Sequence, residues 1–252
     1  MNIHVLRVSV SIRGNNDTTI EMRKITIAID GYSSTGKSTI AKKLAKSLGY
    51  VYVDTGAMYR AVSYYALSND MFRNQKLQKE QLIQALDKIH LEFRLNNTTG
   101  LPEIYLNGDL IEKQIRTLEV SQVVSEIAAI SEVRHKLVQQ QKAMGNNKAI
   151  VMDGRDVGTV IFPDAELKLF MTASANVRAQ RRYMELTERG DKVTYQEVLE
   201  NVQKRDLIDT TRADSPLVKA DGAIEIDSTN LSLEETFQKC LELVNKTLQA
   251  LG

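Results

Sequence analysis

The feature that most constrains the fold of this chain is the segment GYSSTGKS at residues 31–38. It matches the phosphate-binding pattern G-x-x-x-x-G-K-[ST]. An apolar, β-prone run at residues 25–29 precedes it. Residues 39–48 follow with apolar side chains at helical spacing and end before Gly49, a residue type common at helix C-termini. Because a strand, a glycine loop and a helix are the context that this motif requires, we expect an α/β fold organised around it.

The residue types in this segment suit the binding of a nucleoside triphosphate. Gly31 and Gly36 permit backbone angles that side chains forbid. The N–H groups of the loop can therefore surround a phosphate, helped by the helix dipole. Lys37 would reach the terminal phosphates, and the hydroxyl of Ser38 would be a ligand of Mg²⁺. The alternative is a glycine-containing turn before an ordinary helix, which both flanking patterns disfavour.

Composition argues against several other kinds of site. The 252 residues suffice for one large α/β domain with insertions or for two small domains. A net charge of +1 argues against a general surface for nucleic-acid polymers, and no apolar run approaches a membrane span. The single cysteine, Cys240, allows neither an intrachain disulfide nor a cysteine metal cluster and suits a reducing cytoplasm. The three histidines, His4, His90 and His135, lack metal-ligand spacing.

Short apolar runs alternate with helical patterns along the chain. This rhythm predicts a parallel sheet with helices on both faces, a three-layer P-loop fold. In such sheets ligands bind beyond the carboxyl ends of the strands, so the polar residues found there are the candidates for chemistry. The five expected strands are residues 25–29, 50–53, 149–152, 167–171 and 223–226.

The segments between these strands contain clear helical patterns. Residues 119–143 are predicted to form one helix, because their apolar side chains recur at near-helical spacing. Residues 177–186 and 195–207 are predicted to form two polar helices joined by a glycine-containing link. Ser232 and Glu235 have the spacing of a capping box before the final helix.

Residues 69–118 depart from this α/β rhythm, and we expect an inserted subdomain there. Residues 69–79 are polar and loop-like, and residues 80–89 have helical spacing. Two alternating runs at residues 89–95 and 103–106 then predict an antiparallel pair of strands.

The first 23 residues form a further distinct part. They contain a short alternating run but no long apolar stretch of the kind found in signal peptides. We expect residues 1–23 to be an N-terminal extension and residues 24–252 to form the catalytic fold. Met22 lies two residues before Lys24, so an alternative translation start at this methionine is a further hypothesis.

Charged residues follow the second and third expected strands. Arg60 lies one or two turns into the helix after the second strand, where it could reach a second anion beside the loop. Asp153 ends the third strand, where an acid near Mg²⁺ would lie, and Arg155 and Asp156 follow it between glycines. The alternatives are an exposed helix arginine and a solvated loop. The combination of glycines and charges at a strand end favours a functional loop.

Two helical segments place charged side chains on one face each. An exposed helix with internal ion pairs is the simpler interpretation. The excess of arginine over lysine favours phosphate binding, because guanidinium presents a planar fork that stays charged and matches phosphate oxygens. The residues are Arg178, Arg181 and Arg182 in the first helix and Arg205, Asp209 and Arg212 in the second.

The motifs as a set resemble a known family. No N-K-x-D motif of GTPases, no G-x-S-x-G elbow and no dinucleotide fingerprint is found in the sequence. From residue 25 to the C-terminus the chain resembles the bacterial cytidylate kinases, which are P-loop nucleoside monophosphate kinases. The six matching blocks are IDGYSSTGKST, VDTGAMYRAV, IRTLEV, MDGRDVGTVIFPDA, RAQRR and KRDLIDTTRADSPL.

The resemblance implies transfer of the γ-phosphate of ATP to CMP or dCMP in pyrimidine nucleotide metabolism, giving ADP and CDP or dCDP. It implies Mg²⁺ as cofactor, and we expect a cytoplasmic monomer without nucleic-acid or membrane partners. The residues implied for ATP are Gly31, Tyr32, Ser33, Ser34, Thr35, Gly36, Lys37, Ser38 and Thr39. Those implied for CMP are Thr55, Arg60, Arg116, Arg155, Asp156, Arg205, Asp209 and Arg212.

The resemblance also implies a role for each of these residues. Residues 69–118 would be the monophosphate-binding subdomain, and residues 178–195 a helical lid over ATP. Thr55 replaces a serine common in the family but keeps its hydroxyl. The acceptor phosphate would contact Arg60, Arg155 and Arg205, the cytosine Arg116 and Asp156, and the ribose Asp209 and Arg212. The catalytic residues would be Lys37, Asp153, Arg178, Arg181 and Arg182.

The sequence leaves three alternatives open. The chain could be another small-molecule P-loop kinase, acting on UMP, AMP or a non-nucleotide acceptor. It could be a nucleotide-binding regulatory protein that has lost transfer, although the intact Lys37, Ser38 and Asp153 argue against this. A structural adaptor would leave the arginine pattern unexplained.

Overall fold

The computed structural model describes residues 23–74 and 76–251. Its centre is a five-stranded parallel sheet in the order β10-β9-β1-β8-β2. The strands are β1 (Thr26–Gly31), β2 (Val51–Asp54), β8 (Ile150–Gly154), β9 (Leu167–Thr172) and β10 (Ile224–Asp227). All five expected strands are therefore confirmed with bounds shifted by one or two residues. The expected extension lies outside the described residues except for Arg23.

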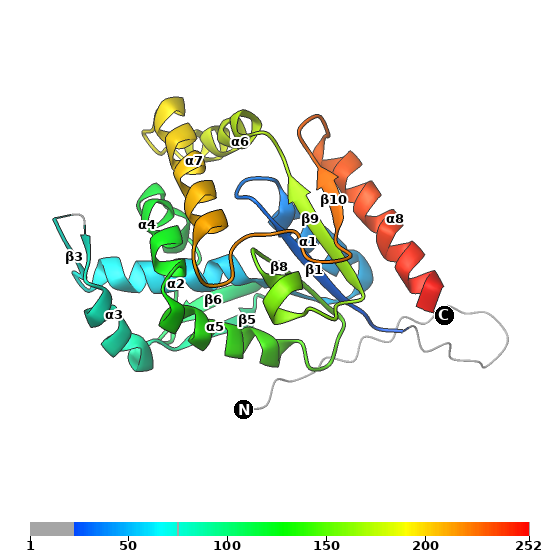
Figure 1. The fold of residues 1–252 in the computed structure, drawn as a ribbon, viewed down its shortest axis with the longest axis horizontal. Helices are drawn as coiled ribbons and strands as arrows, with labels where there is room; N and C mark the ends of the chain where they lie inside the picture. The colour runs from blue at the N-terminus through cyan, green and yellow to red at the C-terminus, as the bar shows by residue number, and fades with distance from the viewer. Residues whose placement is uncertain (1–22, 75, 252) are drawn as a thin grey trace.

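Helices cover the sheet because side chains alternate between its two faces. Ile27 and Ile29 of β1 pack in one cluster with α1 (Lys37–Leu48) and α8 (Leu233–Leu251). Ala28, between them, packs on the opposite side in a cluster with the short helical turn η3 (Val157–Ile161). Figure 1 shows α8 (red) along one side of the sheet, whereas the insertion (cyan to green) lies at the opposite end of the molecule. The three-layer α/β fold is confirmed.

Helix α2 (Thr55–Ser68) leaves the carboxyl end of β2 and carries the insertion. The antiparallel pair is confirmed as β5 (Leu91–Leu95) and β6 (Pro102–Leu106). The structure adds β7 (Asp109–Leu110) and the turn η2 (Gln114–Arg116). The predicted helix divides into α3 (Lys79–Ala85) and η1 (Leu86–Lys88). The expected loop contains a small hairpin of β3 (Phe72–Arg73) and β4 (Lys76–Leu77), whose two-residue strands are too short for an alternating pattern.

The single helix expected at residues 119–143 is wrong. The structure has α4 (Leu118–Ala128) and α5 (Ser131–Met144), separated at Ile130, whose ψ of 118° is extended. Arg134 of α5 donates a hydrogen bond to the carbonyl oxygen of Ala128 at 3.1 Å, which satisfies an acceptor at the end of α4. Apolar spacing continues across the break, so periodicity alone does not reveal it.

Helices α6 (Ala175–Glu188) and α7 (Tyr195–Thr211) confirm the two polar helices and pack together through a small apolar cluster. The capping box before α8 is also confirmed. Ser232 Oγ accepts from the Glu235 N–H at 3.2 Å, and the Ser232 N–H donates to Glu235 Oε2 at 2.8 Å. Among the described residues, no helix combines the length and the apolar character needed to span a bilayer.

Candidate active site

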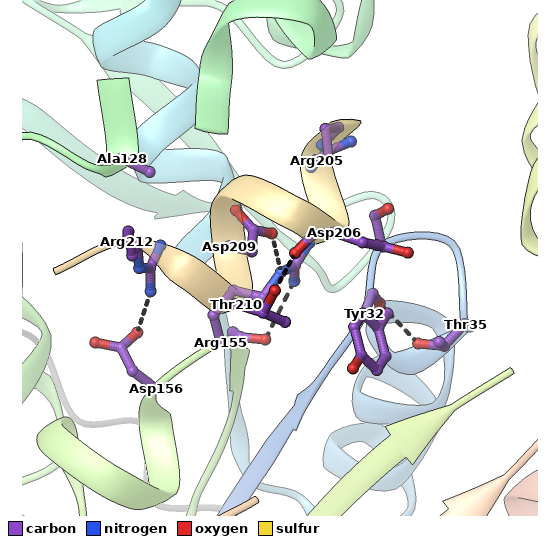
Figure 2. Close-up of polar contacts among 12 residues, drawn as sticks. Tyr32, Thr35, Ala128, Arg155, Asp156, Arg205, Asp206, Asp209, Thr210 and Arg212 are labelled. Atoms are coloured by element: carbon purple, nitrogen blue, oxygen red, sulfur yellow. Dashed lines mark hydrogen bonds and ion pairs between the residues drawn. The ribbon is translucent and has the colours of Figure 1, made fainter. Parts of the chain in front are cut away.

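A cleft of about 360 Å³ opens beyond the carboxyl ends of β1, β2 and β8. The phosphate-binding loop forms one end. The other end is lined by residues of α2, η2, α4, α5, α6, α7 and the loop after β8. Figure 2 shows part of this junction, with residues of α7 near the loop after β8 and near the phosphate-binding loop. Ligand-binding clefts of parallel α/β sheets lie in the same position.

Glycines give the phosphate-binding loop its path. Gly31 has a φ of 145°, and a Cβ there would lie 2.0 Å from the carbonyl oxygen of Met171 on β9. Gly36 has a φ of 90° and forms the N-cap of α1. A side chain at Gly31 would therefore separate β1 from β9, and one at Gly36 would strain the entry into α1.

Lys37 folds back over this loop. Its buried Nζ donates a hydrogen bond to the carbonyl oxygen of Tyr32 at 2.9 Å. Burial, followed by the positive charge of Arg155, lowers the pKa of Lys37 to about 7. A phosphate beside Nζ would supply the missing negative charge and favour the ammonium form.

Ser38 and Asp153 are joined directly. Ser38 Oγ donates to Asp153 Oδ2 at 2.8 Å, and the hydroxyl of Tyr52 donates to Asp153 Oδ1 at 2.8 Å. Burial, with Asp54 as the next cause, raises the pKa of Asp153. In the described part of the chain, no cluster of three His, Cys, Asp or Glu residues could hold a metal alone. One hydroxyl and one carboxylate fit Mg²⁺, which takes few protein ligands and completes its shell with phosphates and water.

Asp54 lies opposite Asp153 in the β2–β8 register and organises two arginines. Its Oδ2 accepts from Arg60 at 2.9 Å and from Arg116 at 3.1 Å, and its Oδ1 accepts from the Ala57 N–H at 2.9 Å. Burial opposes ionisation, but Arg60 and Arg116 hold the pKa of Asp54 well below its usual range. This carboxylate therefore fixes both guanidinium groups at the cleft.

Thr55 is the first residue of α2 and directly follows the carboxyl end of β2. Its hydroxyl donates to the carbonyl oxygen of Asp153 at 2.8 Å. A Cβ on Gly154 would lie 2.4 Å from this hydroxyl, so the glycine after Asp153 is required for the contact. The threonine thereby ties the start of α2 to β8.

A second group of arginines surrounds Asp209 on α7. Arg155 Nε donates to Asp209 Oδ2 at 2.8 Å (Figure 2). Arg205 Nη1 donates to Ser121 Oγ at 3.0 Å. Burial, and then Arg155, lowers the pKa of Arg205 to about 9. Within the described chain, the buried Nε atoms of Arg60 and Arg205 have no hydrogen-bond partner.

Asp156 defines the far end of the cleft. Its carboxylate is paired with Arg134, which is 1% exposed, and lies 4.0 Å from Arg212 (Figure 2). Arg134 also lies over the Tyr59 ring, 5.5 Å from its centroid. The partners of Asp156 are thus Arg134 and Arg212, whereas Arg116 is paired with Asp54 and Glu112. Arg116 and Asp156 line the same cleft but have different ion-pair partners.

The three arginines of α6 have different surroundings. Arg178 is buried and makes a double hydrogen bond to Asp206 at 2.9 and 2.5 Å, outside the cleft lining. Arg181 Nη2 donates to the carbonyl oxygen of Ser228 at 2.7 Å, beside a second hollow that also adjoins Gly36. Arg182 lines the main cleft and donates to the carbonyl oxygen of Arg116 at 3.1 Å. Of the three, Arg182 alone lines the main cleft.

Sequence reasoning missed several residues that shape the site. Asp30 is buried at the end of β1, where it accepts from the N–H groups of Val157 and Gly158 at 2.8 and 2.7 Å. It anchors the turn after Arg155 and Asp156. Asp30 and Asp54 could have been found by the signal that identified Asp153, an acid at a strand's carboxyl end. No such signal marks Arg134, Tyr52 or Asp206, because they lie inside helices or a strand and not at the carboxyl end of a strand.

Comparisons with known proteins agree with this geometry. The family model for cytidylate kinase matches residues 27–246. A cytidylate kinase of Flavobacterium johnsoniae is 64% identical over 228 residues, covering 90% of this chain and 99% of the relative. One from Flavobacterium psychrophilum is 62% identical over 224 residues, covering 89% and 99%. One from Parabacteroides distasonis is 54% identical over 227 residues, covering 90% and 99%. The chain belongs to the cytidylate kinase family.

Proposed function

We propose that the protein transfers the γ-phosphoryl group of ATP to CMP, and to dCMP, releasing ADP and the nucleoside diphosphate. Family membership supports the reaction. The observation that carries it is the surplus of buried cations at the cleft. Burial, followed by neighbouring positive charge, lowers the pKa of both Lys37 and Arg205, and the buried Nε atoms of Arg60, Arg134 and Arg205 have no hydrogen-bond partner in the described chain. Such a site is completed by the anionic phosphates of two nucleotides.

The donor half of the site is the loop at residues 31–39. Its glycines allow the backbone N–H groups to approach the ATP phosphates, and α1 adds the positive end of its dipole. Lys37 exchanges its contact with the Tyr32 carbonyl for the terminal phosphates. Ser38 and Asp153 would hold Mg²⁺, which would supply positive charge beside the transferring group.

The acceptor half binds the phosphate of CMP through arginines that are held in place by carboxylates. Asp54 holds Arg60, and Asp209 holds Arg155, so these guanidinium groups are oriented before the nucleotide arrives. Arg205 adds a charge whose Nε is free of partners among the described residues. The position of Arg116 beside Asp54 favours a place in this phosphate group rather than beside the base.

The far end of the acceptor half is proposed to recognise the cytosine and the ribose of CMP. Cytosine has an amino donor on C4 and acceptors at N3 and O2. The Asp156 carboxylate can accept from the amino group while Arg134 donates to a ring acceptor, so Arg134 takes the role first assigned to Arg116. Asp209 and Arg212 line the same cleft and are proposed to contact the ribose hydroxyls.

The reaction needs no protein nucleophile, because the acceptor phosphate is itself an anion. The residues named above place the two nucleotides in line and neutralise charge as it spreads over the phosphoryl oxygens. We propose that residues 178–195 close over ATP as a lid and that residues 69–118 close over CMP. Closure excludes water, which would otherwise receive the phosphoryl group.

A panel of acceptors tests this function. With ATP and Mg²⁺, we expect CMP and dCMP to give the highest kcat/KM, UMP less, and AMP or a non-nucleotide little. Preference for another acceptor would replace CMP with that substrate, and ATP binding without diphosphate formation would favour a regulatory protein. A monomeric state and a cytoplasmic location are further parts of the proposal, and light scattering of the purified chain measures the first.

A further inference from the structure

We propose that Tyr52 is a positioning residue for the metal end of the donor site, acting through Asp153 on the Ser38 hydroxyl. The inference rests on the proposed Mg²⁺–ATP site and names a residue to which neither the loop motif nor the arginine pattern pointed. Three groups from three different elements are joined in series: β2 supplies Tyr52, β8 supplies Asp153 and α1 supplies Ser38.

The series is built into the sheet. In the parallel β2–β8 register, Tyr52 is aligned with Val151 and Asp54 with Asp153. Tyr52 therefore lies on the neighbouring strand, two positions before the residue that is aligned with Asp153. The Tyr52 ring is 4% exposed and packs in the cluster between the sheet, α1 and α8. Its hydroxyl leaves this apolar cluster and donates to Asp153 Oδ1 at 2.8 Å, a fully buried contact.

The contact fixes an orientation that the backbone leaves free. The terminal torsion of a carboxylate is broad, so its two oxygens need partners to hold one arrangement. Tyr52 occupies Oδ1 of Asp153, which leaves Oδ2 as the acceptor for Ser38 Oγ at 2.8 Å. Because a serine hydroxyl has one proton and gives it to Oδ2, its lone pairs are directed away from Asp153 and are free to face a bound cation.

A structural role alone would affect the molecule differently. A phenylalanine would fill the same space in the apolar cluster, so packing does not require the hydroxyl. If the hydroxyl served stability only, its removal would lower the melting temperature and leave metal-dependent binding intact. If it orients Asp153 and Ser38, its removal weakens the part of nucleotide affinity that depends on Mg²⁺.

The experiment compares Tyr52→Phe with Tyr50→Phe. Tyr50 is a matched control because it lies two residues earlier, and its hydroxyl accepts from the Ile25 N–H at 3.2 Å, outside the cleft lining. Calorimetry measures ATP binding to each full-length protein in excess Mg²⁺ and in excess EDTA. The ratio of the two affinities gives the Mg²⁺-dependent gain, and thermal melting checks that each variant is folded.

For Tyr52→Phe we expect the Mg²⁺-dependent gain to fall on the order of tenfold, while the affinity in EDTA stays within about twofold of wild type. Tyr50→Phe should keep the full gain. A full gain in folded Tyr52→Phe, or equal losses with Mg²⁺ and with EDTA, would overturn the inference and leave the kinase proposal intact. A wild-type protein without any Mg²⁺-dependent gain would overturn the metal site itself, and the inference with it.

Discussion

The two ends of the cleft are built in different ways. The donor end is one continuous segment, residues 31–39, whose shape comes from backbone angles at Gly31 and Gly36. The acceptor end is assembled from side chains of α2, η2, α5, the loop after β8 and α7, which are distant in sequence. A phosphate site can thus be encoded locally, whereas recognition of a particular nucleoside requires the tertiary fold.

The two ends also use charge differently. At the donor end, Lys37 is held by a neutral carbonyl oxygen, which a phosphate can readily replace. At the acceptor end, carboxylates hold the arginines through charged hydrogen bonds, as Asp54 does for Arg60 and Asp209 for Arg155. We therefore expect the donor end to rearrange on binding, whereas the arginines of the acceptor end are oriented beforehand.

Substitution of Lys37 should break the donor end with the largest effect. For Lys37→Ala we expect kcat to fall at least about a hundredfold, because the cation beside the transferring phosphoryl group is lost. Affinity for CMP, measured by calorimetry, should change little. Lys46→Ala, at an exposed position on the same helix, is the control. Substantial turnover by Lys37→Ala would contradict the assignment.

A change at Asp156 should alter recognition of the base. Asparagine can donate to the O4 atom of uracil, so Asp156→Asn should lower the ratio of kcat/KM for CMP to that for UMP by about tenfold, the value of one mismatched hydrogen bond. Using the ratio within one variant removes any common effect of the lost pairing with Arg134. The control is Asp164→Asn, at an exposed position after the same loop. An unchanged ratio would remove Asp156 from the base site.

Asp209 should affect the sugar more than the base. In Asp209→Ala, we expect kcat/KM for CMP to fall several-fold more than that for dCMP, because only CMP presents the 2′-hydroxyl. Loss of the contact with Arg155 weakens both substrates equally and cancels in the comparison. Equal losses for CMP and dCMP would show that Asp209 does not contact this hydroxyl.

The smallest expected effect is on the pH dependence of stability and concerns Asp30, which anchors the turn after Arg155 and Asp156. Burial raises the pKa of Asp30 from 3.8 to about 7, despite hydrogen bonds from Gly158 and Val157. The folded state therefore binds this proton more tightly than the unfolded state. The resulting stabilisation is complete below pH 3.8 and is lost as the pH rises through about 7.

Thermal or urea unfolding between pH 5 and pH 8 measures this dependence. In Asp30→Asn we expect a lower stability at every pH, because the amide cannot accept from both N–H groups, and a flatter fall with pH than in wild type. The difference in slope should not exceed about 1.4 kcal/mol per pH unit for one group. Parallel curves would mean that Asp30 does not titrate in this range.

The contrast between the two ends explains how much the sequence could predict. The five strands, and the order of strand, glycine loop and helix around residues 31–38, follow from apolar periodicity and local glycine patterns, and the structure confirms this arrangement. The break at Ile130 could not be predicted from periodicity, because the apolar spacing continues across it. Arg134 was missed at the site because its ion pair with Asp156 joins α5 to the loop after β8, and helical spacing does not reveal such a contact.

The positions of individual arginines were also beyond sequence reasoning. Arg178, Arg181 and Arg182 occur together on one helix, but their environments depend on Asp206, on the segment after β10 and on η2, respectively. Helical spacing identifies which side chains share a face, whereas it cannot identify the acceptors that this face meets. The three arginines therefore have different acceptors, and of the three only Arg182 lines the cleft.

We propose that the two ends form one cleft in which a phosphoryl group passes from ATP to CMP. The most direct measurement is the amount of ADP and CDP formed by the wild-type protein with ATP and Mg²⁺, in the presence and absence of CMP. We predict equal amounts of ADP and CDP with CMP, and very little ADP without it. Formation of ADP without CDP, at a rate that CMP does not change, would contradict the claim.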